Sequence, residues 1–395
     1  MNLIERHLIS RDKTEWQQLD ELSFASKNLY NATLYIVRNH FFDTSKLINH
    51  GVLYQAVKAA YSSDYYALPT KVSNQVIIQF LHDFKTWFAT LKSYKLNSTA
   101  FAGRPKLPKY KDKLHGRNVL IYELGTFSKP CLRKGQIKVT GLDLVLTTTK
   151  VNVKQLRIVP TTYAYAIEIV YEQKESPLAE QGFIAGLDIG LNNLGALTSN
   201  RTGLAPLLIN GRPLKSINQF YNKRLAELQQ KNVANWKIEK LTFKRNNKIN
   251  DYLHKASLEV VRWCLVNGVG LLVIGKNDQW KTEINLGKRT NQNFVQIPHA
   301  RFIQMIQYKA QLYGLQVMLT EESYTSKCSF LDLELLGKHE TYAGKRVKRG
   351  LFRSSTGKTL NADINGSLNI IRKVAPDAFS RGVEAVAVQP KAISL

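Results

Sequence analysis

The sequence of 395 residues has little cysteine, few acidic residues and no long hydrophobic run. Its three cysteines, Cys131, Cys264 and Cys328, are scattered and form no C-x-x-C pair, which excludes a disulfide scaffold and a four-cysteine zinc site. No stretch reaches the roughly 18 apolar residues of a transmembrane helix, and residues 1–7 lack the apolar core of a secretion signal. We therefore expect a protein of the reducing cytoplasm.

Glycine and proline are ordinary in number, at 23 and 11, and hydrophobic residues make up 44% of the chain. These values exclude collagen-like, mucin-like and wholly disordered chains. At this length we expect two or three domains, each with enough apolar side chains for its own core.

The scarcity of acids makes the net charge strongly positive. Lys and Arg number 56 against 30 Asp and Glu, which gives +26 at pH 7. An excess of this size suits a polyanionic partner whose condensed counterions are released on binding, so a nucleic acid is the favoured partner. A basic membrane-surface protein is the rival, and the lack of long apolar runs counts against it.

The first part of the chain is predicted to be helical and then β-rich. Apolar residues recur at helical spacing over 14–38 and 76–91, and their spacing indicates ordinary helix-packing faces. A basic, proline-containing linker follows at 102–113. Alternation over 163–171 predicts an antiparallel β module, which a strand at residues 3–9 would complete. We place the helical block at 11–110 and the β module at 1–10 and 111–180.

Residues 181–395 have the pattern of an α/β domain. Three short strands near 183–187, 195–198 and 206–209 are predicted to form a meander. Helices are expected at 214–230, 252–267 and 299–313, with buried strands at 270–274 and 315–319, and a last helix beginning at Asp363.

Three carboxylates fall at positions of this domain where chemistry can occur. Asp188 ends the first buried strand, where an unpaired charge is costly. Asp363 would open the last helix, a place where aspartate also serves as a plain cap. Glu322 follows the strand at 315–319, and taken alone it is typical of a surface acid. If the three meet at one sheet edge, they form a site for two hard divalent cations, which is typical of a nuclease.

Three segments in this order and spacing resemble the RuvC-type nuclease domain of TnpB proteins, the RNA-guided endonucleases of insertion sequences. They are Gly186-Leu187-Asp188-Ile189-Gly190, Tyr324-Thr325-Ser326-Lys327 and Asp363-Ile364-Asn365-Gly366-Ser367. Type V CRISPR effectors and the Fanzor proteins are related to that family. Residues 28–35 and 105–111 resemble, more weakly, the family's recognition lobe and the hinge that follows it. The resemblance thus covers essentially the whole chain.

The resemblance implies an RNase H-like nuclease domain at 181–395, an antiparallel β wedge at 1–10 and 111–180, and a helical recognition lobe at 11–110. It also implies catalytic, metal-binding Asp188, Glu322 and Asp363, with Mg²⁺ as cofactor, two ions in number, or Mn²⁺ instead. Hydrolysis would leave a 3′-hydroxyl and a 5′-phosphate. The expected partners are a guide RNA, of transposon or CRISPR type, and a double-stranded DNA target with a short adjacent motif, with one protein per RNA. The protein would then associate with the bacterial nucleoid.

Two departures from the family pattern bear on the site. The family's second acid usually ends the strand at 271–274, but Gly275-Lys276-Asn277 stands there. Some family members and Fanzors resemble this chain in having the acid relocated before the Thr-Ser-Lys segment, which favours Glu322, with Glu321 as the alternative. A chain without a second acid would instead be a nuclease-dead, RNA-guided repressor.

The other departure concerns the segment at 325–360, where family members usually carry a four-cysteine zinc ribbon. Only Cys328 is present, so no zinc is expected. The segment is rich in cations instead, and we expect either a mobile loop or a lid that holds the displaced DNA strand. The residues predicted to bind nucleic acid are Arg104, Lys106, Lys109, Lys111 and Lys113 in the linker and Lys345, Arg346, Lys348 and Arg349 in this segment.

An ATPase of the sugar-kinase and actin class is the remaining rival, because Asp188-Ile189-Gly190 followed by asparagine is similar to its first phosphate loop. The chain has no second phosphate loop of that class, and ATP binding does not account for the net charge.

Overall fold

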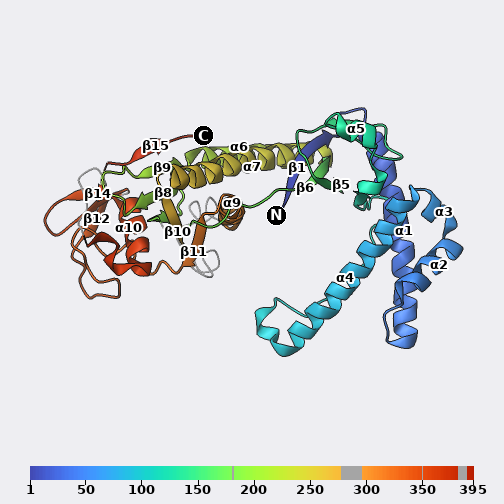
Figure 1. Cartoon of the computed structure of the whole chain (residues 1–395), viewed down its shortest axis with the longest axis horizontal. Coiled ribbons are helices and arrows are strands. Elements are labelled where there is room, and N and C mark those ends of the chain that lie inside the picture. Colours follow the sequence, from blue (N-terminus) through green and yellow to red (C-terminus); the bar gives the residue numbers. More distant parts are fainter. Residues whose placement is uncertain (180–181, 277–295, 349, 381–388) are drawn as a thin grey trace. The chain divides into compact units, whose positions relative to one another are not determined.

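The computed structural model describes residues 1–179, 182–276, 296–348, 350–380 and 389–395. The chain divides into two compact units, Met1–Gln173 and Lys174–Leu395, each of which is described by itself (Figure 1). Among the described residues, no helix is both long and apolar enough to cross a membrane.

The first unit contains a four-stranded antiparallel sheet. Its strands are β1 (Asn2–Ser10), β6 (Ala164–Glu172), β5 (Val153–Pro160) and β2 (Leu120–Glu123), in the spatial order β1-β6-β5-β2. The predicted completion of the β module by the N-terminal strand is confirmed, because β1 pairs along its whole length with β6. A separate hairpin consists of β3 (Gln136–Lys138) and β4 (Val145–Thr147).

Helices α1 (Trp16–Thr44) and α4 (Thr70–Leu96) match the two predicted helices and extend beyond them, while α2 (His50–Ala60), α3 (Ser62–Tyr66) and α5 (Lys129–Arg133) were not predicted. Apolar side chains of α1 and α4, such as Leu29 and Phe80, join Ile158 and Ile167 of the sheet in one buried cluster. Helices and sheet therefore share a core in this unit. The finer division into a recognition lobe and a wedge stays a prediction.

The second unit is built on a six-stranded sheet. Its strands are β7 (Phe183–Asp188), β8 (Asn193–Ser199), β9 (Leu207–Asn210), β10 (Val269–Gly275), β11 (Gln316–Thr320) and β15 (Lys391–Ile393), in the order β11-β10-β7-β8-β9-β15. The predicted meander is confirmed, since β7, β8 and β9 are antiparallel neighbours. Strands β10 and β11 run parallel to β7, so their carboxyl ends meet the end of β7 at one edge.

Helices cover both faces of this sheet. Helices α7 (Asn235–Val266) and α9 (His299–Leu312) contribute to a core on one face, and α10 (Ala362–Val374) packs on the other face through Ile364, Leu368 and Ile371. Helix α6 (Arg212–Gln230) runs beside α7 (Figure 1). The start of α7 was predicted at Tyr252, and the helix begins at Asn235 instead.

The cationic insertion is a folded element. It contains a three-stranded antiparallel sheet of β12 (Lys345–Lys348), β13 (Leu351–Arg353) and β14 (Thr359–Asn361). Phe330 and Phe352 are buried with Leu360 and Ile371, which joins the insertion to α10. In the part of the insertion that the structure describes, these strands and buried side chains form regular structure, and the choice between a loop and a lid stays a prediction.

Candidate functional site

Asp188 is the last residue of β7, where the strand leaves the core at a half-buried position. Two glycines let α10 approach this strand closely. A Cβ on Gly186 would lie 2.3 Å from the carbonyl oxygen of Ser367, and a Cβ on Gly366 would lie 2.6 Å from Oδ2 of Asp188. The Ser367 hydroxyl also donates to the Gly186 carbonyl at 2.8 Å. The Asp188 carboxylate is thereby held against the first turn of α10.

Asp363 lies in that first turn, but it is not the cap of the helix. Asn361 is the N-cap, and its side chain accepts hydrogen bonds from the backbone N–H groups of Asp363 and Ile364. The Asp363 carboxylate is left for other partners. Its Oδ2 accepts from Nδ2 of Asn193 at 2.7 Å, and its Oδ1 lies 3.5 Å from Nη2 of Arg346.

Glu322 comes two residues after β11 and lies at the carboxyl end of β10. A Cβ on Gly275 would be 2.9 Å from Oε2 of Glu322, so the carboxylate fills the space beside the glycine. The alternative acid, Glu321, has a side chain that is 58% exposed and forms an ion pair with Lys373 at 2.8 Å. Of the two neighbours, Glu322 is the one next to the other acids.

The turn after Glu322 is fixed by buried asparagines of α10. The Thr325 hydroxyl donates to the Glu322 carbonyl at 2.8 Å. Asn365 and Asn369, both fully buried, donate from their amides to the carbonyl oxygens of Thr325 and Cys328. The Asn365 side chain also accepts from the Phe330 N–H at 2.9 Å. These bonds tie the position of Glu322 to the helix that carries Asp363.

The electrostatics place the three acids in one neighbourhood. Burial raises the pKa of Asp188 well above its usual range, the carboxylates of Asp363 and Glu322 raise it further, and the Arg346 guanidinium opposes them. Burial, aided by Glu321 and opposed by Lys373, raises the pKa of Glu322 to about 7. A buried carboxylate whose ionisation is opposed by two neighbouring acids, as that of Asp188 is, indicates a place that a cation would stabilise.

The donor set fits a hard divalent cation, which prefers carboxylate oxygens. Asp188, Glu322 and Asp363 come from the end of β7, from just after β11 and from the start of α10, and the charges of Glu322 and Asp363 act on Asp188. Within the described ranges, no group of three or more His, Cys, Asp or Glu side chains is drawn together closely enough to hold a metal by itself. The three acids therefore have the oxygen ligands that such an ion prefers, and the charges of Glu322 and Asp363 act on Asp188. Their carboxylates do not by themselves surround one ion position.

Four of the five predicted linker cations, Arg104, Lys106, Lys109 and Lys113, are exposed. Lys111 differs, because its Nζ lies 4.9 Å from the centre of the Tyr30 ring and burial lowers its pKa. The linker is also held on α1, since Asn31 exchanges two hydrogen bonds with the Lys111 backbone.

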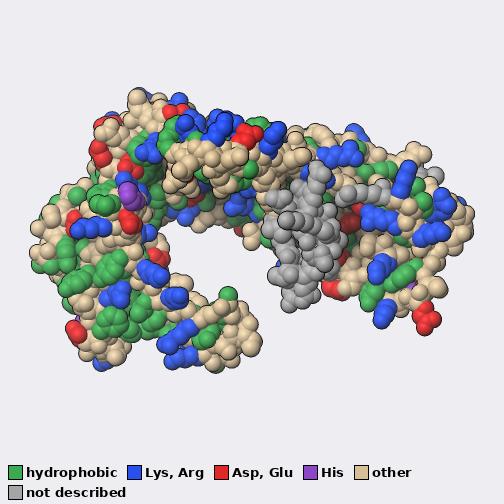
Figure 2. Space-filling model, turned by 180° about the vertical axis from the view of Figure 1, so that it is seen from behind, with side chains coloured by type: hydrophobic (Ala, Val, Ile, Leu, Met, Phe, Trp, Pro, Cys, Tyr) green, Lys and Arg blue, Asp and Glu red, His purple; other side chains and the backbone are tan. Residues whose placement is uncertain are grey.

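In the insertion, Lys345, Arg346 and Lys348 lie on β12 and are exposed. Arg346 reaches Asp363, as described above, while Arg349 lies outside the described residues. Figure 2 shows Lys and Arg side chains on the visible face of both units. The insertion also contains the buried Cys328, whose thiol donates to the Gly337 carbonyl at 3.7 Å.

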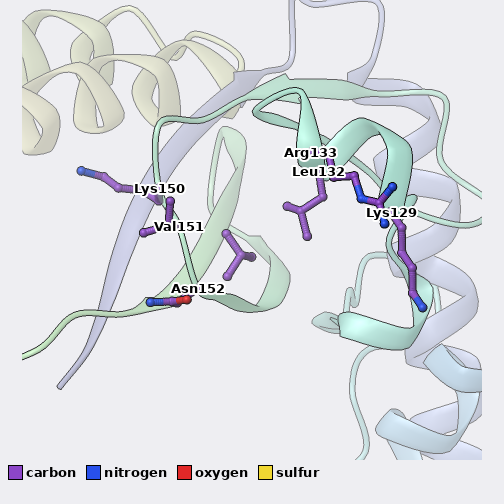
Figure 3. Close-up of a pocket in the computed structure, with 7 residues that line it drawn as sticks. Lys129, Leu132, Arg133, Lys150, Val151 and Asn152 are labelled. Atoms are coloured by element: carbon purple, nitrogen blue, oxygen red, sulfur yellow. The ribbon is translucent and has the colours of Figure 1, made fainter.

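A cavity of about 380 Å³ lies in the first unit, between α5 and the start of β5 (Figure 3). Its walls mix apolar and cationic side chains from Lys129, Leu132, Arg133, Lys150, Val151, Asn152 and Val153. It contains none of the three acids, which belong to the other unit.

Sequence reasoning brought the three acids together but missed their supports. Asn193, Asn361, Asn365 and Asn369 were visible within the motifs, yet a single sequence does not show which amide caps a helix and which holds a loop. The pair of Arg346 with Asp363 was also missed, because its partners meet only through the packing of β12 to β14 near α10.

Two family models match successive parts of the chain. One, described as a probable transposase of the OrfB_IS605 type, matches residues 168–281. The other, described as the Cas12f1-like TNB domain, matches residues 299–370. The second match includes Glu322, Asp363 and the cationic insertion.

Two curated proteins are similar to parts of the chain. A TnpB-like protein, ORF457 of Acidianus two-tailed virus, is 26% identical over 208 residues, which cover 48% of this chain and 41% of that protein. The CRISPR-associated endodeoxyribonuclease Cas12f2 of a Micrarchaeota archaeon (strain CG1_02_47_40) is 24% identical over 228 residues, covering 53% of this chain and 40% of that protein. The matched segments thus span about two fifths of the curated relatives.

The fold is similar to that of a solved Cas12f1 in a complex with its sgRNA and target DNA. The TM-score is 0.54 at 16% identity, covering 90% of this chain and 83% of that one. The expected mixed fold, an α/β domain together with a unit of β-sheet and helices, is confirmed by this similarity and by the sheet order described above.

Proposed function

We propose that this chain, which matches family models of OrfB_IS605 and Cas12f1-like type and resembles TnpB proteins, is an RNA-guided DNA endonuclease whose RuvC-type site uses Asp188, Glu322 and Asp363. The single observation that carries this proposal is the convergence of the three acids. The charges of Glu322 and Asp363, which lie far away in sequence, both act on Asp188 at the end of β7. The proposed partners are a guide RNA and a double-stranded DNA target with a short adjacent motif.

In this site the carboxylates of Asp188, Glu322 and Asp363 would hold the Mg²⁺ ions. When bound, the ions supply an activated water and stabilise the leaving oxygen of the phosphodiester. Asn193 orients the Asp363 carboxylate through its hydrogen bond, and the Thr325 turn orients Glu322. The guanidinium of Arg346, which is half exposed beside Asp363, would contact a phosphate of the DNA strand.

Purified protein loaded with its co-purified RNA tests the proposal on plasmid DNA that carries the sequence the guide specifies. We expect cleavage with Mg²⁺ and none with EDTA. Asp188→Ala should abolish cleavage while RNA binding is retained, and Glu321→Gln serves as the matched control that cuts like the unchanged protein. Cleavage that persists in Asp188→Ala would contradict the site assignment.

A nuclease-dead, RNA-guided repressor is the second candidate, and it is favoured by Gly275, which stands where the family's usual second acid would end β10. The plasmid-cleavage assay distinguishes the repressor from the endonuclease. RNA-loaded protein that binds its target but leaves it intact with both Mg²⁺ and Mn²⁺ would favour the repressor.

A further inference from the structure

Gly275 is glycine for a reason other than backbone conformation. It ends β10, pairs in register with Thr320 of β11 and is not among the described residues with positive φ. A side chain is therefore compatible with its backbone. The constraint comes from space, because an added Cβ would lie 2.6 Å from Cδ1 of Ile370 and 2.9 Å from Oε2 of Glu322.

We propose that Gly275 is a positioning residue for Glu322, and that positions 275 and 322 compete for one space at the sheet edge. A side chain at 275 would displace the Glu322 carboxylate from the neighbourhood of Asp188. An acid can then stand at the end of β10 or after β11, but not at both places. The consequence for metal binding rests on the proposed function, whereas the steric competition does not.

Ile370 and Glu322, the two residues nearest to a Cβ added at Gly275, allow this steric competition to be tested. Ile370 is fully buried and approaches from α10, so Gly275→Ala alone could act by disturbing the core. Ile370→Val removes the Cδ1 atom that would clash. Of the three nearest atoms to a Cβ at 275, the two that remain in the Ile370→Val background are Oε2 and Cβ of Glu322, at 2.9 and 3.3 Å.

The first experiment is metal-free and follows thermal unfolding in EDTA. In the Ile370→Val background, we expect Gly275→Ala to lower the unfolding midpoint by about 2–4 °C when Glu322 is present. In a chain that also carries Glu322→Gly, the same change should be neutral or raise the midpoint, since alanine is favoured over glycine within a strand. An equal effect of Gly275→Ala in both backgrounds would overturn the proposal.

The second experiment measures Mn²⁺ binding to the RNA-loaded protein by electron paramagnetic resonance. Gly275→Ala in the Ile370→Val background should weaken binding roughly 10- to 100-fold, the usual effect of misplacing a ligand's support. Moving the acid, with Gly275→Glu, Glu322→Gly and Ile370→Val combined, should restore part of the affinity. Unchanged Mn²⁺ affinity in Gly275→Ala with Ile370→Val would contradict the proposal.

The two experiments also distinguish a failure of the proposed metal site from a failure of the proposed competition between positions 275 and 322. If Glu322→Gln binds Mn²⁺ as well as the unchanged protein does, the assignment of Glu322 as a ligand fails, and with it the proposed set of acids. The metal-free experiment still decides whether the side chains at 275 and 322 compete.

Discussion

At the scale of single residues, the three proposed acids are supported mainly by neutral residues, with the cation of Arg346 beside Asp363. Asn361 takes the capping role at the start of α10, which leaves the Asp363 carboxylate to Asn193 and Arg346. Gly366 and Gly275 leave room for the carboxylates of Asp188 and Glu322. That the three acids are the ligands stays a prediction from sequence, whereas these supports depend on contacts between distant segments that a sequence alone does not show.

The raised pKa of Glu322 predicts a pH dependence of stability. Because the folded-state pKa of about 7 lies above the ordinary value of 4.5, this group favours folding below pH 4.5 and loses that contribution as pH rises through 7. In EDTA, unfolding by urea should therefore show Glu322→Gln to be more stable than the unchanged protein at pH 8, by about 1–3 kcal/mol. The difference should shrink by pH 5.

Glu340→Gln is the control, because that side chain is exposed and is not among the groups that shift the pKa of Glu322, so it should show no such pH-dependent gain. The interpretation fails if Glu322→Gln is no more stable at pH 8 than at pH 5 relative to the unchanged protein. Saturating Mg²⁺ should reverse the order at pH 8, since the ionised carboxylate is then a ligand.

Arg346 should have two effects of opposite sign. As a cation 3.5 Å from Asp363, it competes with a metal ion for that carboxylate, so Arg346→Ala should lower the Mn²⁺ concentration needed for half-saturation. The same change should weaken DNA binding, because the proposed phosphate contact of Arg346 would be lost. Lys345→Ala on the same strand is the control, and we expect it to leave Mn²⁺ affinity unchanged.

At the scale of elements, α10 organises the site. It carries Asp363, approaches β7 through Gly186 and Gly366, and holds the segment after Glu322 through Asn365 and Asn369. The three acids are thus attached to one helix and to the strand ends around it.

Asn365→Ala tests this role of α10. It would leave the buried N–H of Phe330 without its acceptor and remove a donor from the Cys328 carbonyl. We expect a loss of about 1–3 kcal/mol in the free energy of unfolding. Lys358→Ala, at an exposed position of the same insertion, should stay within about 0.5 kcal/mol. Urea denaturation of both variants measures the difference, and equal stabilities would contradict the assigned role.

The periodic elements could be predicted from sequence because their signals are local. Helices α1, α4, α6 and α9 and the strands β1, β7, β8, β10 and β11 lie close to the predicted ranges. The first half of α7 was missed because its residues at 235–248 are mostly polar and few are buried. Strand β15 was missed because it is short and is defined by its pairing with β9.

At the scale of the whole molecule, the charge of +26 is the property that the proposed partners explain most directly. Cations that serve nucleic-acid binding should be exposed, and cations that serve the fold should not. The linker contains both kinds, since Lys106 is exposed and Lys111 packs over Tyr30.

This contrast predicts different consequences for two lysines in one linker. Lys106→Ala should reduce the dependence of nucleic-acid affinity on salt, lowering the slope of log K against log[salt] by about 0.7–0.9, with little effect on stability. Lys111→Ala should lower the unfolding midpoint and change the slope less. Filter-binding titrations at several salt concentrations, with thermal unfolding, would show whether the two variants differ in this way.

The central claim is that Asp188, Glu322 and Asp363 together bind divalent cations. Its most direct test is the count of Mn²⁺ ions bound to the RNA-loaded protein, measured by electron paramagnetic resonance. We expect about two ions in the unchanged protein and weaker or incomplete binding in each of Asp188→Asn, Glu322→Gln and Asp363→Asn, with Glu321→Gln unaffected. Full binding in Glu322→Gln, with the same count and affinity as the unchanged protein, would contradict the claim.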